Sequence, residues 1–124
     1  MSKPSILVVD DELLIRDLLY DFFTGQGWDI AVADNGDKAL EMTHARKFDL
    51  VLTDVKMPEM DGLALTGHLR QSFPKMPIVI MTGFPSVDSA VAALRHKADD
   101  YIIKPFNINQ LYKVLEAKIR ESRA

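Results

Sequence analysis

Short apolar runs alternate with helical patterns along the whole chain. Residues 5–9, 50–54 and 78–82 form runs that are too short for a helix and rich in β-branched side chains. Such runs predict strands buried on both faces. The weaker runs at residues 30–33 and 101–103 are typical of edge strands.

Between these runs, apolar residues recur at helical spacing. The first helical stripe consists of Leu14, Leu18, Leu19, Phe22 and Phe23, and the glycines that follow it, Gly25 and Gly27, predict its end. Asn35, Ser86 and Asn107 stand where they can cap the second, fourth and fifth helices. A third helix is expected at about residues 63–72, before Pro74.

The resulting order is strand then helix, five times, which predicts one α/β domain spanning residues 1–124. Fully apolar central strands indicate a doubly wound parallel sheet covered by helices on both faces. Periodicity alone leaves either of the common doubly wound strand orders open. In both, ligands bind beyond the carboxyl ends of the strands.

Composition narrows the functional classes. The sequence has no cysteine, no apolar stretch long enough to span a membrane and no signal-peptide core, which together favour the cytoplasm and no membrane role. The formal net charge of −3 argues against direct nucleic-acid binding.

Four of the five expected strands end in, or lead directly into, a polar group. The pair Asp10-Asp11 follows the first, Asp54 closes the third, Thr82-Gly83 closes the fourth, and Lys104 follows the fifth. Each alone is commonplace, as a helix cap, a turn or a solvated lysine. Their coincidence on one sheet edge instead favours a shared site.

Three carboxylates at such an edge repel one another by about 3 kcal/mol per pair, at a separation of about 5 Å and an effective dielectric of about 20. Lys104 supplies one positive charge, and a divalent cation would balance the rest. Oxygen ligands suit Mg²⁺. A carboxylate beside Mg²⁺, a lysine and the Thr82 hydroxyl has the parts for phosphoryl transfer, with Asp54 as the nucleophile of an acyl phosphate.

Four segments, in this order, resemble the receiver domains of two-component response regulators across nearly the whole chain. They are residues 6–12 (ILVVDDE), 54–62 (DVKMPEMDG), 82–83 (TG) and 99–106 (DDYIIKPF). The resemblance implies a flavodoxin-like sheet of strand order 2-1-3-4-5. It also implies a signalling phosphoprotein that acts only on itself, rather than an enzyme with a separate substrate.

The resemblance assigns a role to each site residue. Asp54 would accept phosphate from a sensor histidine kinase or a phosphotransfer protein. Asp11, Asp54 and the backbone carbonyl of Lys56 would bind Mg²⁺ directly, and Asp10 through a water. Lys104 would contact the phosphoryl group and precede a cis proline.

The resemblance also implies a switch. Thr82 would move toward the phosphate and Tyr101 would turn inward, altering the surface of the fourth helix, fifth strand and fifth helix. That surface would signal to an output domain or form a homodimer. No output domain is expected within these 124 residues.

Two features depart from the family or extend it. Lys97 stands where the family usually has glycine, which predicts a strained or rebuilt turn. The outward side of the fourth helix should carry small or weakly charged residues, which suggests a partner surface: Asp88, Ser89, Ala92 and Ala93.

Two other functions remain as alternatives. A Mg²⁺-dependent hydrolase of the haloacid dehalogenase type needs Asp-x-Asp after the first strand, whereas Asp10 and Asp11 are adjacent and Lys56 stands two residues after Asp54. A receiver-like module that no longer takes phosphate is not favoured, because every expected site position carries a suitable residue.

Overall fold

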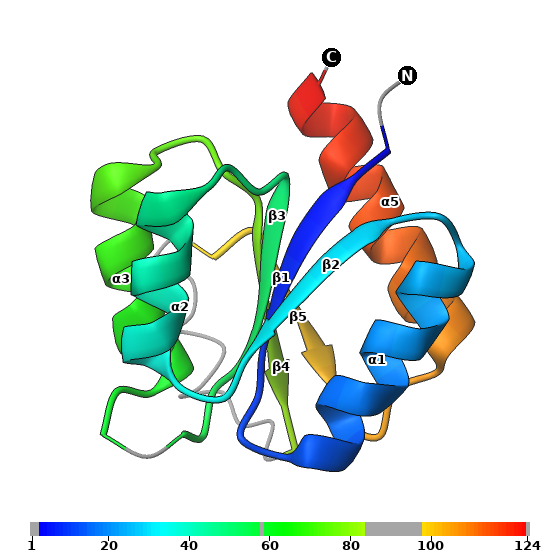
Figure 1. Ribbon diagram of the computed structural model, residues 1–124, viewed down its shortest axis with the longest axis horizontal. Helices are drawn as coiled ribbons and strands as arrows, with labels where there is room; N and C mark the ends of the chain where they lie inside the picture. Colours follow the sequence, from blue (N-terminus) through cyan, green and yellow to red (C-terminus); the bar gives the residue numbers. More distant parts are fainter. Residues whose placement is uncertain (1–2, 58, 84–97, 124) are drawn as a thin grey trace.

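A five-stranded parallel sheet lies between two layers of helices (Figure 1). The computed structural model describes residues 3–57, 59–83 and 98–123. Along the chain the elements are β1 (Ser5–Val9), α1 (Leu13–Gly25), β2 (Asp29–Ala33), α2 (Gly36–Ala45), β3 (Leu50–Asp54), α3 (Gly62–Ser72), β4 (Ile78–Thr82), β5 (Asp100–Ile103) and α5 (Ile108–Arg123).

The strand order is β2-β1-β3-β4-β5, with every neighbouring pair parallel. This is the flavodoxin-like order that the resemblance implied and that periodicity left open. The two weaker apolar runs form the edge strands, β2 and β5, as predicted. β3 lies at the centre, and all five of its residues are buried.

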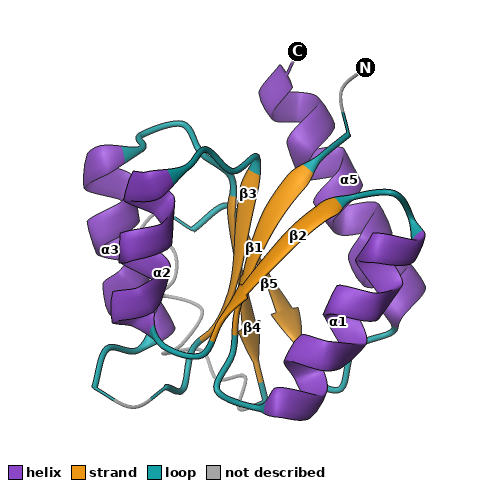
Figure 2. Ribbon diagram, in the orientation of Figure 1, coloured by secondary structure: helices purple, strands orange, loops and turns teal. Residues whose placement is uncertain are grey.

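Each face of the sheet has its own hydrophobic cluster, because successive strand side chains point to opposite faces. Helices α1 and α5 cover one face and helices α2 and α3 cover the other (Figure 2). The first cluster includes Ile6, Leu52 and Met81 with Leu19, Phe23 and Leu115. The second includes Leu7, Val9 and Val51 with Ala39, Leu65 and Leu69.

Side-chain caps begin three helices. The Oδ1 atom of Asn35 accepts from the backbone N–H of Lys38, and Asn107 Oδ1 accepts from those of Asn109 and Gln110. Both predicted asparagine caps are therefore confirmed. At α3, Asp61 is the cap and accepts from the N–H of Ala64.

The predicted apolar stripe of α1 is only partly buried. Leu19 and Phe23 are fully covered, but Leu14 is 80% exposed and Leu18 is 48% exposed. The spacing correctly predicts a helix, but it does not decide which of these side chains are buried. The helix buries a narrower face than the stripe predicts, and Leu13, also exposed, widens the apolar surface on its outer side.

Several predictions concern residues outside the described part of the chain. These are the Ser86 cap, the surface at Asp88, Ser89, Ala92 and Ala93, and the turn at Lys97. Within the described segments, none of the helices has both the length and the apolarity needed to cross a bilayer.

Candidate functional site

The sheet order brings the polar strand ends together. Asp10 follows β1, Asp54 ends β3, Thr82 ends β4 and Lys104 follows β5. Because β3 lies between β1 and β4, Asp54 is the central member of this group. These residues were predicted to converge. They lie at one edge of the sheet, where Lys104 contacts Asp10 and Asp54 and where Thr82 lines the same pocket as Asp54.

Lys104 joins the carboxylates of this edge. Its Nζ atom lies 2.8 Å from Asp10 Oδ2, 3.3 Å from Asp54 Oδ2 and 3.7 Å from Glu12 Oε1. The lysine side chain is only 14% exposed. The Lys104–Pro105 peptide is cis, as expected from the resemblance. The amine therefore lies close to carboxylates from the end of β3 and from the loop after β1.

Asp10 is fully buried and held on several sides. Its Oδ1 accepts from the backbone N–H of Glu12 at 2.9 Å, while its Oδ2 accepts from Lys104. The Arg16 guanidinium donates to the backbone carbonyl of Asp10 at 2.8 Å. These bonds fix the loop between β1 and α1, so that Asp11 and Glu12 are presented at the mouth of the site.

The environment shifts the protonation of two groups. Burial raises the pKa of the Asp54 carboxyl, and the negative charge of Asp10 raises it further, against the opposing effect of Lys104. Burial lowers the pKa of Lys104, but the hydrogen bond and charge of Asp10, with those of Asp54, outweigh burial and leave it above its ordinary value. The site therefore disfavours a negative charge on Asp54 beside that of Asp10, and it favours the cationic form of Lys104.

The donor set of this edge suits a hard cation. One carboxylate oxygen from each of Asp10, Asp11, Glu12 and Asp54 lies within 4.8 Å of the others. Asp10 and Asp54 are buried, whereas Asp11 and Glu12 are exposed. Carboxylates alone, partly open to water, match the preference of Mg²⁺ for oxygen ligands and retained waters.

Glu12 is the member of this cluster that the sequence prediction missed. It directly follows Asp10-Asp11, so the acidic run was visible, but only the loop conformation turns its carboxylate back toward the pocket. The same residue is the N-cap position of α1, without a side-chain cap hydrogen bond.

A pocket of about 290 Å³ opens over Asp54. Its walls include Asp11, Glu12, Lys104 and the predicted residues Lys56, Thr82 and Gly83. Thr82 is 6% exposed. Every residue predicted for the phosphate and metal positions therefore either lines this pocket or, like Asp10, contacts one that does.

Gly62 is required by a close approach rather than by an unusual backbone angle. Gly62 has no positive φ and begins α3. A Cβ atom built on it would collide with the backbone carbonyl oxygen of Asp54. Its N–H donates to the carbonyl of Val55 at 2.8 Å, so α3 starts directly against the segment that carries Asp54.

Tyr101 lies apart from the pocket. It pairs in register with Ile80, whereas Thr82 pairs with Ile103. Tyr101 is 43% exposed and Ile103 is 47% exposed on this edge strand. The aromatic side chain is therefore partly exposed on the edge strand β5, and its inward turn on phosphorylation stays a prediction.

A parallel five-stranded α/β fold with an acidic pocket at its carboxyl edge defines a class of phosphate- or metal-binding signalling and enzyme domains. The family model described as "Response regulator receiver domain" matches residues 6–116. The chain therefore belongs to the receiver domain family of two-component response regulators.

Relatives and solved structures agree with this placement. The chain is 42% identical over 98% of its length to the transcriptional regulatory protein ZraR of Salmonella typhimurium, and 37% identical over 96% to the DNA-binding transcriptional regulator NtrC of Escherichia coli. It covers 28% and 25% of those proteins. The chain therefore spans about a quarter of the length of the curated relatives it matches.

Two solved structures show the same pattern. A CheY-like receiver domain protein from Methanospirillum hungatei superposes with a TM-score of 0.95 at 30% identity, covering 98% of each chain. NtrX from Brucella abortus gives a TM-score of 0.91 at 35% identity, covering 98% of this chain and 28% of that one. The hydrolase alternative finds no support among these comparisons.

Proposed function

We propose that this chain is a phosphorylation switch in which Asp54 accepts a phosphoryl group from a phosphohistidine on a sensor histidine kinase or phosphotransfer protein. The observation that supports this most is the contact of one amine, Lys104, with both Asp10 and Asp54 in a pocket open to solvent. A buried carboxylate that faces a cation and an open space is suited to attack and to hold an anionic group.

In the proposed step an Oδ atom of Asp54 forms a bond to phosphorus as the phosphorus–nitrogen bond of the donor breaks, and the donor imidazole leaves. Lys104 would turn from the carboxylates toward the phosphoryl oxygens and balance their charge. The Thr82 hydroxyl would donate to one of these oxygens. All three groups already border the same pocket, so positioning supplies much of the rate.

Mg²⁺ is the cofactor we propose for the acidic cluster. Asp11, Asp54 and the backbone carbonyl of Lys56 would hold it directly and Asp10 through a water, with Glu12 as a further carboxylate nearby. Bound there, the cation would neutralise negative charge on the transferred group.

We propose that Thr82 and Tyr101 transmit the phosphorylated state. A Thr82 hydroxyl drawn to phosphate would vacate space on the pocket's flank, and Tyr101, now 43% exposed, would turn inward to fill it. This is a population shift toward an arrangement that phosphate binds better. The altered face, which would comprise the predicted fourth helix with β5 and α5, would contact an output domain or a second copy.

The remaining assignments follow from this role. We treat residues 1–124 as a single receiver domain that catalyses only its own phosphorylation and dephosphorylation. It is proposed to act in the cytoplasm, where kinases draw on ATP, and to leave nucleic-acid contact to other domains. NtrC is named as a DNA-binding regulator, but this chain matches only a quarter of it.

The test is labelling by acetyl phosphate with Mg²⁺, followed by intact mass and peptide mapping. One added phosphoryl group at Asp54 is expected, absent in Asp54→Asn and absent when EDTA replaces Mg²⁺. Asp34→Asn is the matched control, because Asp34 is an exposed aspartate just after β2 at the same edge. Full labelling of Asp54→Asn, or equal labelling in EDTA, would refute the proposal.

A further inference from the structure

A second pocket lies between the end of α2 and the connection from α3 to β4. It is a groove of about 490 Å³, and its apolar walls are Phe48, Phe73, Pro74 and Met76. These residues precede β3 and β4, so the groove lies at the amino edge of the sheet, opposite the acidic pocket. It takes no part in the function proposed above.

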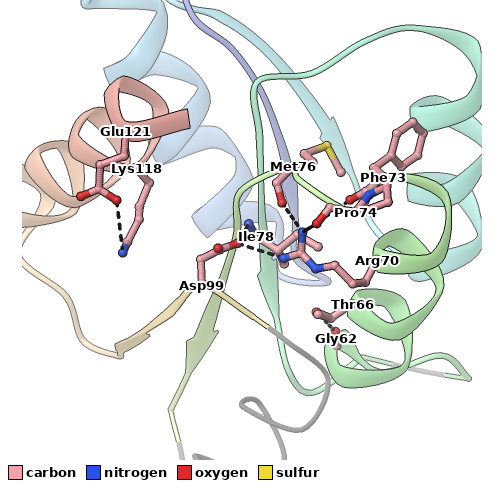
Figure 3. Close-up of polar contacts among 10 residues, drawn as sticks. All are labelled: Gly62, Thr66, Arg70, Phe73, Pro74, Met76, Ile78, Asp99, Lys118 and Glu121. Atoms are coloured by element: carbon pink, nitrogen blue, oxygen red, sulfur yellow. Dashed lines mark hydrogen bonds and ion pairs between the residues drawn. The ribbon is translucent and has the colours of Figure 1, made fainter. Parts of the chain in front are cut away.

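Arg70 makes the wall of this groove rigid. From the last turn of α3 its Nη1 atom donates to the backbone carbonyls of Pro74 at 3.0 Å and Met76 at 2.8 Å, with a longer contact to Phe73 at 3.4 Å (Figure 3). Its Nη2 donates to Asp99 at 3.0 Å. The loop carbonyls are therefore bonded within the protein, so the groove keeps apolar side chains as its lining and a preformed shape.

Asp99 completes the support from the other side. Its Oδ2 atom accepts both from Arg70 and from the backbone N–H of Ile78 at 2.7 Å (Figure 3). The side chain of Arg70 is only 14% exposed. The Arg70 guanidinium is thus bonded to the loop carbonyls and to Asp99, and Arg70 does not line the groove.

Among the described residues, three other cations and no acidic residue line the groove. The Arg46 guanidinium lies 4.5 Å from the centre of the Phe48 ring and is paired with Asp29 at 2.6 Å. Lys47 and Lys75 also border the groove and are exposed. In the part of the chain that the structure describes, neither lysine takes part in an ion pair.

We propose that this groove binds a small organic carboxylate whose body is apolar. A preformed, mainly apolar pocket of about 300–1,000 Å³ with a few charged groups at its rim is the usual form of a small-molecule site. Phe48, Phe73 and Met76 would cover the apolar body. Lys47 and Lys75 would attract the carboxylate, whereas an amine of the same size would be repelled by both lysines.

The binding test uses sodium octanoate as the probe and ¹⁵N-labelled full chain in a two-dimensional NMR titration. Saturable shifts of the amides of residues 43–48, 72, 73, 75 and 76 are expected, with a dissociation constant on the order of 1 mM. Octylamine, with the same chain and the opposite charge, should give shifts at least about tenfold weaker at equal concentration. Equal binding of octylamine, or octanoate shifts confined to other residues, would overturn the proposal.

Charge reversal tests the role of the lysines. The double variant Lys47→Glu with Lys75→Glu should bind octanoate roughly tenfold more weakly or worse. Lys113→Glu is the control, because Lys113 is an exposed lysine on α5 and takes part in no ion pair among the described residues. Unchanged affinity of the double variant, or equal weakening by Lys113→Glu, would contradict the assignment. All three lysines are exposed, so folding should be retained and is checked by the remaining amide shifts.

Discussion

The amine of Lys104 is shared unequally between two buried carboxylates, at 2.8 Å from Asp10 and 3.3 Å from Asp54. Asp10 also accepts the backbone N–H of Glu12, so it is the better compensated of the two. Burial, and next the negative charge of Asp10, raise the pKa of the Asp54 carboxyl against the opposing effect of Lys104. The carboxylate at the centre of the site is thus held at a cost to stability.

Asp54→Asn should therefore stabilise the metal-free protein. Removing one buried charge that faces Asp10 should raise the free energy of unfolding by about 1–2 kcal/mol, measured by thermal or urea unfolding in EDTA. Mg²⁺ should then stabilise the wild-type chain more than the variant. Asp34→Asn, at an exposed position, should change stability by less than about 0.5 kcal/mol. A clear loss of stability in Asp54→Asn without metal would contradict this account.

Stability should also depend on pH through Asp54. Because its pKa is raised on folding, the folded state holds the proton more tightly, and stability falls as pH rises from the ordinary carboxyl pKa of 3.8 through the raised value. The difference in unfolding free energy between Asp54→Asn and wild type should therefore grow from about pH 4 toward neutral pH in EDTA and then level off. Saturating Mg²⁺ should reduce it. A difference in unfolding free energy that becomes smaller as pH rises would contradict this prediction.

Gly62→Ala tests the close approach of α3 to Asp54. The added methyl group would meet the backbone carbonyl of Asp54, so the loop must move, at a cost of about 1–3 kcal/mol in urea unfolding and with slower labelling by acetyl phosphate. Gly25→Ala is the matched control, since a Cβ there meets nothing within 4 Å. Equal effects of the two substitutions would mean that the contact with Asp54 is unimportant.

Arg70→Ala should be among the most harmful surface-facing changes. It removes hydrogen bonds to loop carbonyls and to Asp99 together, for an expected loss of about 2–3 kcal/mol. Arg120→Ala provides the comparison, because the Arg120–Glu116 pair on α5 is exposed on both sides and should contribute less than about 0.5 kcal/mol. Similar losses for the two variants, in urea unfolding, would argue against a buried role for Arg70.

Much of the fold could be predicted because apolar runs and caps are local signals. The edge strands, the central strands and the caps at Asn35 and Asn107 all follow from residues close in sequence. Strand order could not, since two doubly wound orders share the same periodicity. Which side chains of the α1 stripe are buried could not be predicted, because a stripe records spacing, whereas burial depends on how wide a face the sheet and neighbouring helix can cover.

The candidate site could be predicted to about the same extent as the fold. The convergence of Asp10, Asp54 and Lys104 followed from the rule that parallel strands end at one edge. The contribution of Glu12 did not, because it depends on the path of the loop after β1. The need for Gly62 did not follow from the sequence either, because the carbonyl that a side chain would strike is brought there by the fold.

The five buried residues of β3 have a further consequence. Leu52 packs with the layer of α1 and α5, and Val51 with the layer of α2 and α3. Deleting one residue from this strand would turn the side chains beyond the deletion to the opposite faces of the sheet. It would also move Asp54 back by about 3.3 Å, out of reach of the Lys104 amine. Surface loops of this domain can vary in length, but the length of the central strand sets the distance between Asp54 and the Lys104 amine.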